Sequence, residues 1–258
     1  MKYIFTLLFI SFKLMAAMVE APIISVDNAN ETVEIKIDKI DVGVSGFVVH
    51  NITPEHSSIL KNAVVKSFNE ANKTAIIQTS DFHMLDNDSV PKGKWHVKVG
   101  DSVELAFGYS RSLLIAPSEE IYHQISKSIN TQWIHPDLFA TVLSFRGHPT
   151  PLVEDFQAMA DATSTGLLFI FLDKKIYTVD MKSFHILSIS DAPLEQRRVH
   201  LPFYTRVENI DANWFGKGSS RLTSYAPHYY ALLLQNNKEN KELQALYEKS
   251  KIGKENDR

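Results

Sequence analysis

Histidines are the residues of this chain whose side chains could most readily act as metal ligands or proton carriers. A helical zinc protease needs two histidines four residues apart with a glutamate between them, and no pair here has that arrangement. No carboxylate stands at a fixed short offset that would complete a catalytic pair. We therefore expect ordinary surface or half-buried roles for the ten histidines, which are His50, His56, His83, His96, His123, His135, His148, His185, His200 and His228.

Serine and glycine patterns do not support catalysis either. The chain has no Gly-x-Ser-x-Gly nucleophile motif. The fragment GKGSS at residues 216–220 lacks the preceding strand and the Lys-Ser/Thr ending of a phosphate-binding loop. The polar loop DNDSVPKG at residues 86–93 lacks the ligand spacing of a calcium loop. The sequence thus predicts no metal, no cofactor and no enzymatic activity.

Length and composition limit the class of protein to which this chain can belong. A chain of 258 residues with 44% apolar residues can bury a substantial core. Its net charge of −3 argues against a nucleic-acid partner, which would require a basic surface. The absence of cysteine excludes disulfides and thiolate metal sites.

The first 17 residues have the pattern of a secretory signal peptide. Lys2 precedes a short apolar run, and the small pair Ala16 and Ala17 follows as a cleavage site. A buried N-terminal helix is the alternative interpretation. We expect an exported protein that retains no transmembrane helix after signal removal, located in the periplasm, at the outer membrane or on the cell surface.

Residues 18–110 read as a β-rich subdomain. Residues 32–37 alternate apolar and polar side chains, as a half-buried strand does. Residues 62–68 and 74–79 flank a turn-like tetrad and predict a hairpin. Two further strands are expected at residues 95–99 and 102–107, joined by a tight turn at Gly100 and Asp101. Short strands at this spacing predict a small barrel or rolled sheet.

Residues 111–234 read as an α/β subdomain in which helices cover a sheet. The stretch RSLLIAPSEEIY at residues 111–122 is an apolar strand followed by a helix that Ser118 caps. In WIHPDLFA at residues 133–140, Pro136 opens a second helix. The run GLLFIFL at residues 166–172 predicts a strand buried on both faces. A terminal helix begins near Pro227, and residues 235–258 form a charged helical tail. The predicted fold class is mixed α/β (α+β).

Aromatic residues gather between positions 203 and 215. Phe203, Tyr204, Trp214 and Phe215 are expected in the core, since aromatic clusters usually pack there. The alternative is the rim of an interaction surface, where Tyr, Trp and Arg concentrate binding energy.

The segments at residues 111–122 and 133–140, with FYTRVENID at 203–211 and the tyrosine pair Tyr229 and Tyr230, resemble one bacterial family. That family is the N-terminal domain of the plasminogen-binding protein PgbA, and the resemblance covers residues 23–234. It implies a surface protein that captures host plasminogen through lysines, because kringle modules recognise a cation and a carboxylate held a fixed distance apart.

The family resemblance directs attention to the basic residues of the tail, Lys249, Lys251, Lys254 and Arg258. Arg258 ends the chain with a charge and a carboxylate, but its planar guanidinium is a poorer mimic of lysine. Lys249 with Glu242, seven residues earlier, is an internal pair that could imitate the same dipole. The alternative function is a periplasmic or outer-membrane-associated structural or assembly factor that docks on other envelope proteins and has no plasminogen role.

Overall fold

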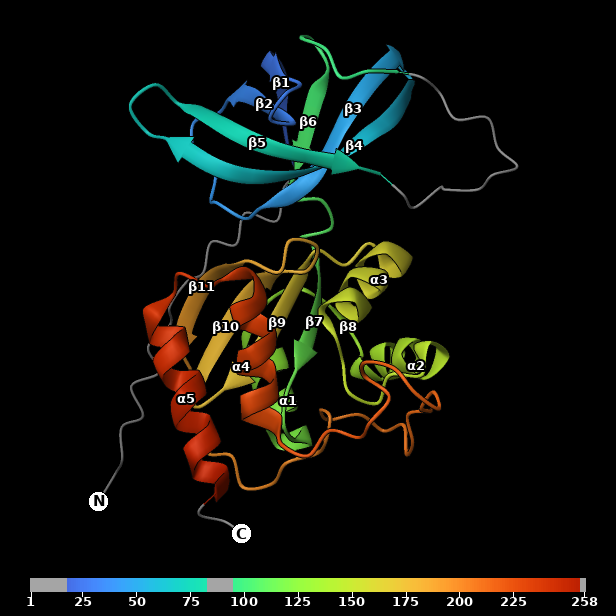
Figure 1. The fold of residues 1–258 in the computed structure, drawn as a ribbon, viewed down its shortest axis with the longest axis vertical. Helices are drawn as coiled ribbons and strands as arrows, with labels where there is room; N and C mark the ends of the chain where they lie inside the picture. Colours follow the sequence, from blue (N-terminus) through green and yellow to red (C-terminus); the bar gives the residue numbers. More distant parts are fainter. Residues whose placement is uncertain (1–17, 83–94, 256–258) are drawn as a thin grey trace.

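The computed structural model describes residues 18–82 and 95–255, with side chains up to residue 252. The predicted signal peptide and the polar loop at residues 86–93 lie outside the described residues. Figure 1 shows a β-barrel stacked above a second, helix-covered sheet. The predicted mixed α/β fold, with a β-rich first half, is confirmed.

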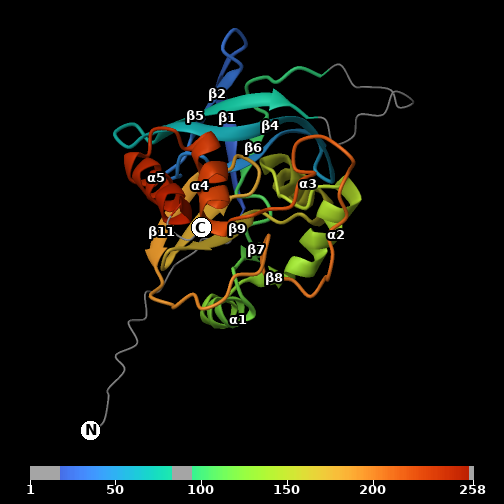
Figure 2. The ribbon, with the colours of Figure 1, turned by 60° about the horizontal axis from the view of Figure 1, so that its bottom comes forward.

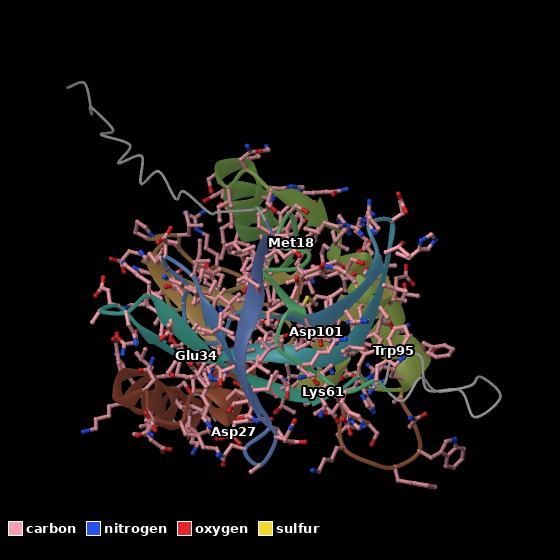
Figure 3. The ribbon with its side chains drawn as sticks, turned by 90° about the horizontal axis from the view of Figure 1, so that it is seen from above. Met18, Asp27, Glu34, Lys61, Trp95 and Asp101 are labelled. Atoms are coloured by element: carbon pink, nitrogen blue, oxygen red, sulfur yellow. The ribbon has the colours of Figure 1, made fainter. Side chains whose placement is uncertain are left out.

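The barrel is closed, with strand order β1-β2-β5-β4-β3-β6. Its strands are β1 (Val19–Asp27), β2 (Thr32–Lys36), β3 (Ser45–Thr53), β4 (His56–Asn69), β5 (Thr74–Asp81) and β6 (Ser102–Leu105). Antiparallel pairing of β1 with β6 closes the ring, with Val19 opposite Leu105. Alternate side chains such as Val33 and Ile35 are buried inside, which explains the period-two pattern of the sequence. Figure 3 looks onto the barrel, with Met18 marking the residue before β1 and Asp27 the end of that strand.

The strand expected at residues 95–99 is absent from the ladder, and that prediction is wrong. The carboxylate of Asp101 accepts a hydrogen bond from the Lys98 amide at 2.9 Å, and Gly100 has a left-handed φ of 95°. Beyond the turn, the Gly100 amide donates to the carbonyl of Ile23 at 3.1 Å and the Ile23 amide donates to that of Asp101 at 2.8 Å. In this stretch only Val99 and Asp101 form an isolated bridge.

The second sheet has the order β11-β10-β9-β7-β8. Its strands are β7 (Arg111–Ile115), β8 (Gln132–Ile134), β9 (Leu167–Leu172), β10 (Lys175–Asp180) and β11 (Ile186–Asp191). β7 runs parallel to both β8 and β9, whereas β9, β10 and β11 form an antiparallel meander. The helices are α1 (Glu119–Ser128), α2 (Pro136–Arg146), α3 (Val153–Thr163), α4 (Tyr225–Asn236) and α5 (Lys241–Glu255).

Helices lie on both faces of this sheet (Figure 2). On one face α1 contributes Ile121 and Ile125 to an apolar cluster that continues into the barrel. On the other face α2, α3 and α4 pack against alternate residues of β7 and β9. Every residue of β9 is buried, so the prediction of a strand buried on both faces is confirmed.

One buried carboxyl group joins the barrel to the second sheet. Asp180, at the end of β10, accepts hydrogen bonds through Oδ2 from the Ser45 amide (2.8 Å), the Ser45 hydroxyl (2.8 Å) and the Tyr109 hydroxyl (2.7 Å). Its Oδ1 accepts from the amides of Lys182 (3.0 Å) and Ser183 (2.8 Å). Burial, followed by the charge of Asp180, raises the pKa of Tyr109 far above its ordinary value. Residues of both layers therefore share one polar anchor.

The C-terminal segment forms two helices in place of the single terminal helix expected. Asn237 follows α4 and donates to the carbonyls of Leu233 (2.7 Å) and Phe184 (3.0 Å) while accepting from the Ile186 amide (2.9 Å). These side-chain bonds end α4 and attach its end to the start of β11. The chain then turns, and Asn240 caps α5 by accepting from the Leu243 amide at 3.0 Å.

Candidate functional site

Helix α5 carries the basic residues that the sequence marked as partner-binding. It is fixed to the body rather than free, because Leu243 is fully buried and Leu246 and Tyr247 pack against the same apolar cluster. Lys175 of β10 also donates to Glu242 at 3.1 Å. Any ligand that binds these lysines therefore meets a rigid helix on the protein surface.

The four predicted residues differ in their surroundings. Lys249 is exposed and has no hydrogen-bond or ion-pair partner within the described part of the chain. Lys251 donates to Glu248 at 3.0 Å and lies 3.9 Å from the centre of the Tyr247 ring. The bond to Glu248 raises the pKa of Lys251. Lys254 belongs to α5, but its side chain, like Arg258, lies outside the described residues.

The internal pair of Lys249 and Glu242 is weakened by a competitor. Seven residues of helix separate the two positions by about 10 Å along the axis and leave them on one side. Glu242 is already bonded to Lys175, whose pKa is raised by that bond. A ligand that reads Glu242 together with Lys249 must compete with Lys175.

The carboxyl ends of the parallel strands β7 and β9 are a second place to look, since open α/β sheets bind ligands there. In this protein the chain itself fills that position. The hydroxyl of Tyr225 lies 3.2 Å from the carbonyl oxygens of both Ile115 and Phe171 and shares its one proton between them. The amides of His200 and Tyr204 donate to Pro117 and Ala116 at 2.7 and 2.8 Å. We call the residues that cover these strand ends, Tyr225, His200 and Tyr204, the plug. No pattern in the sequence predicted it.

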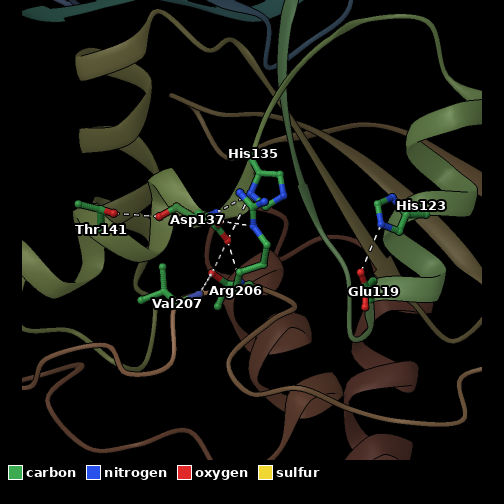
Figure 4. Close-up of polar contacts among 8 residues, drawn as sticks. Glu119, His123, His135, Asp137, Thr141, Arg206 and Val207 are labelled. Atoms are coloured by element: carbon green, nitrogen blue, oxygen red, sulfur yellow. Dashed lines mark hydrogen bonds and ion pairs between the residues drawn. The ribbon is translucent and has the colours of Figure 1, made fainter.

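A group of ionisable and aromatic side chains surrounds the plug, and we call it the rim cluster. It consists of Glu119, Tyr122, His123, His135, Asp137, His200, Tyr204 and Arg206. The ring of Tyr204 lies 5.4 Å from that of Tyr122 and 6.3–6.5 Å from the three histidine rings. Figure 4 shows two separate polar contacts at this site, one around Asp137 and one between Glu119 and His123.

Asp137 is the most constrained member of the rim cluster. Burial acts to raise its pKa, but hydrogen bonds from the Arg206 amide (2.8 Å), the Thr205 hydroxyl (2.8 Å) and Arg206 Nε (2.7 Å) outweigh it, so the pKa is lowered. His135 Nδ1 accepts from the Asp137 amide at 3.2 Å and so caps α2. Burial lowers the pKa of His135, which favours the neutral ring that such a cap requires.

The rim cluster has a structural role, because its polar groups are engaged in hydrogen bonds that hold segments of the chain together. The carboxylate of Asp137 is occupied by its three donors, and the acceptor nitrogen of His135 is occupied by the helix. Within residues 18–82 and 95–255 no group of three potential ligands could hold a metal ion. The cluster fastens residues 200–206 to the starts of α1 and α2.

The aromatic group between residues 203 and 215 divides into two. Phe203 and Tyr204 are buried, as predicted. Trp214 and Phe215 are exposed, so the prediction that they belong to the core is wrong. Their loop lies beside α2 (Figure 1), where the amide and side chain of Asn213 donate to the carbonyls of Gly147 and Arg146, and the two aromatic side chains remain exposed.

The fold and its surface define a class of protein before any relative is considered: a mixed α/β protein with exposed lysines on a fixed C-terminal helix. Comparison with known proteins identifies the family. Residues 18–233 match the model described as "Plasminogen-binding protein pgbA N-terminal", and the chain belongs to this family.

Two relatives are proteins named "Plasminogen-binding protein PgbA" from two strains of Helicobacter pylori. They are 27% and 26% identical to this chain over 213 residues, which is 81% of the chain and 46% of each relative. The chain thus matches about half the length of these relatives. No solved structure matches the chain. None of the helices in the described part of the chain is long and apolar enough to cross a membrane.

Proposed function

We propose that this protein is exported to the cell envelope or surface and captures host plasminogen through the lysines of α5. Two observations support the proposal: membership of a family whose relatives are named as plasminogen-binding proteins, and the ammonium group of Lys249, which has no ion-pair partner among the described residues and stands on an anchored helix. Export is supported by the pattern of the first 17 residues.

Lys249 is the residue that carries this proposal. An ammonium without an ion-pair partner can enter a lysine-binding site without first breaking a contact in its own protein. Lys251 must give up Glu248, although an exposed pair of this kind contributes only about 0–1 kcal/mol. Lys249 should therefore contribute more to binding than Lys251.

Point substitutions test this proposal better than deletion of α5. Removing the helix would uncover Leu243 and its neighbours, and binding could then be lost through misfolding. We expect Lys249→Ala to weaken binding to immobilised plasminogen more than Lys251→Ala, and 6-aminohexanoic acid to compete. Lys66→Ala is the matched control, because Lys66 is an exposed lysine on the barrel.

The end of the chain provides a second test. Arg258→Lys places a compact ammonium beside the terminal carboxylate, so it should strengthen binding. If neither the unchanged chain nor the Arg258→Lys variant shows binding that 6-aminohexanoic acid removes, the plasminogen proposal is refuted.

The alternative function is a periplasmic or outer-membrane-associated structural or assembly factor. The exposed pair Trp214 and Phe215 favours it, because such side chains are usually covered by a partner or a surface. Protease treatment of intact cells distinguishes the two: a plasminogen-capturing protein must be degraded from outside, whereas a periplasmic factor is protected.

A further inference from the structure

Three aromatic side chains at one corner of the part built around the second sheet are almost completely exposed. The exposed fractions are 93% for Phe145, 96% for Trp214 and 85% for Phe215. We call these three residues the aromatic corner. Where the structure describes side chains, the next most exposed large apolar residue, Ile252, reaches only 62%. The three highest exposures thus occur together, which is unusual for residues scattered singly over a surface.

The aromatic corner is brought together by specific hydrogen bonds. The Asp211 amide donates to the Ser144 hydroxyl at 2.9 Å, and the Asn213 amide and side chain donate to the carbonyls of Gly147 (3.0 Å) and Arg146 (2.8 Å). A side chain at Gly147 would collide with Asn213, because a Cβ there would lie 2.2 Å from it. The loop is therefore seated on the end of α2, directly beside Phe145.

The other side of the loop is fixed as well. The Thr150 amide donates to the carbonyl of Gly218 at 3.0 Å, and its hydroxyl donates to that of Ser220 at 2.6 Å. Trp214 and Phe215 thus lie between two attached points. A loop held on both sides presents these rings outward as a fixed feature of the fold.

The charges near the aromatic corner are balanced. Lys217 and Arg221 stand against Glu208 and Asp211 in the same segment. The neighbouring Arg146 and Arg206 are paired with Asp155 and Asp137. An acidic or basic macromolecule would therefore gain little here from electrostatic attraction. The complementary surface is neutral and apolar.

The exposure of each ring also indicates the shape of that surface. Rings that are 85–96% exposed do not pack together into a flat face, so a folded protein would need a separate pocket for each one. The interfacial layer of a bilayer deforms around protruding side chains and favours Trp and Phe. We propose that the aromatic corner inserts into the interfacial layer of a lipid bilayer and holds the protein at a membrane surface as a peripheral contact.

This placement has a consequence for the rest of the molecule. In Figures 1 and 2 the loop beside α2 and helix α5 lie at opposite lateral edges of the second sheet, although α2 and α5 cover the same face of it. A protein seated on a membrane through the aromatic corner would hold the lysines of α5 away from the lipid. The membrane proposal does not depend on plasminogen binding, and the two involve different residues.

Vesicle flotation tests the proposal directly. The chain used should begin at Met18, because an apolar leader would itself bind vesicles, and every described strand and helix lies after that residue. We expect this chain to float with phosphatidylcholine vesicles. The double variant Trp214→Ala/Phe215→Ala should lower vesicle partitioning about ten-fold or more, since each ring buries a large apolar area. Trp95→Ala, which removes a half-exposed ring from the barrel side, is the matched control and should float like the unchanged chain.

Fluorescence provides a second readout. A variant with Trp95→Phe and Trp133→Phe keeps Trp214 as its single tryptophan, and its emission should shift to the blue and be quenched by brominated lipid. Thermal melting of the double variant should match that of the unchanged chain, because the removed side chains contact almost nothing.

Three outcomes would overturn the proposal. One is flotation that persists in the double variant, and another is flotation that occurs only with anionic lipid, which would indicate a charged surface instead. The third is an absence of flotation combined with self-association that Trp214→Ala abolishes, which would assign the aromatic corner to a second copy of the chain.

Discussion

Replacing Asp180 with Asn tests the polar anchor between the barrel and the second sheet. The carboxyl group is completely buried and accepts five hydrogen bonds, three at Oδ2 and two at Oδ1. Asparagine fits the same space but presents an NH2 group where one oxygen was. The NH2 group can replace either Oδ2, which accepts three hydrogen bonds, or Oδ1, which accepts two, so replacing Oδ1 costs less. In that orientation the NH2 group faces the amides of Lys182 and Ser183, and both of these donors lose their acceptor.

The expected loss of stability follows from those two donors. A buried donor left without its partner costs about 1–3 kcal/mol. Asp180→Asn should therefore reduce the free energy of unfolding by about 2–6 kcal/mol, a large part of the roughly 5–15 kcal/mol that stabilises a typical domain. Tyr109→Phe removes a single bond to a charged acceptor and should cost about 1.5–3 kcal/mol.

Urea unfolding of the chain from Met18 measures these effects, with far-UV circular dichroism and tryptophan fluorescence as separate signals. In variants that keep Trp95 or Trp133 as the single tryptophan, Trp95 reports on the barrel side and Trp133, in β8, on the second sheet. Asp161→Asn is the control: Asp161 forms a partly exposed ion pair with Lys182, and its loss should cost at most about 1 kcal/mol.

A loss below about 1 kcal/mol for Asp180→Asn would refute the assignment of Asp180 as the anchor. The same curves test the proposed division into residues 18–110 and 111–234. If the two parts can fold separately, the Trp95 and Trp133 transitions should separate once the anchor is weakened.

Three further predictions concern the core, pH and export. Phe169→Ala in β9 should cost about 3–5 kcal/mol by urea unfolding, because the ring is buried against Trp133, and a value under about 1 kcal/mol would contradict a core role. Burial lowers the pKa of His228 below its ordinary value of 6.5, so the unfolded chain binds the proton more readily than the folded chain. The contribution of neutral, buried His228 to the free energy of unfolding should be fully present above about pH 6.5 and decrease as the pH falls below that value. His228→Gln should flatten that decrease, and an unchanged pH profile would assign it to other groups. N-terminal sequencing of the protein from its native host should find a start near Ala17 or Met18, and retention of Met1 in a cytosolic fraction would contradict export.

The candidate site shows the limits of a residue-by-residue interpretation. Lys249, Lys251, Lys254 and Arg258 were selected because of family resemblance, and nothing in their spacing distinguished them from other charged residues. The structure separates two of them by their contacts, since Lys249 is free within the described chain and Lys251 is paired with Glu248. Pairing of this kind depends on side-chain geometry, which composition does not report.

The sequence by itself determined the features that depend on neighbouring residues. Alternation along residues 32–37 predicted β2, the continuous apolar run at residues 166–172 predicted β9, and Ser118 marked the start of α1. In each case the burial pattern or the cap involves residues a few positions apart, so the signal is local.

Only the tertiary structure decided which surfaces are covered and which remain open. Asn237 divides the C-terminal helices through bonds to β11, Tyr225 closes the carboxyl ends of β7 and β9, and Trp214 and Phe215 stay exposed. Periodicity shows which side chains share a face but not what that face meets, and an irregular loop has no periodicity at all. The burial of such residues is set by contacts between segments distant in the sequence, which exist only once the chain has folded.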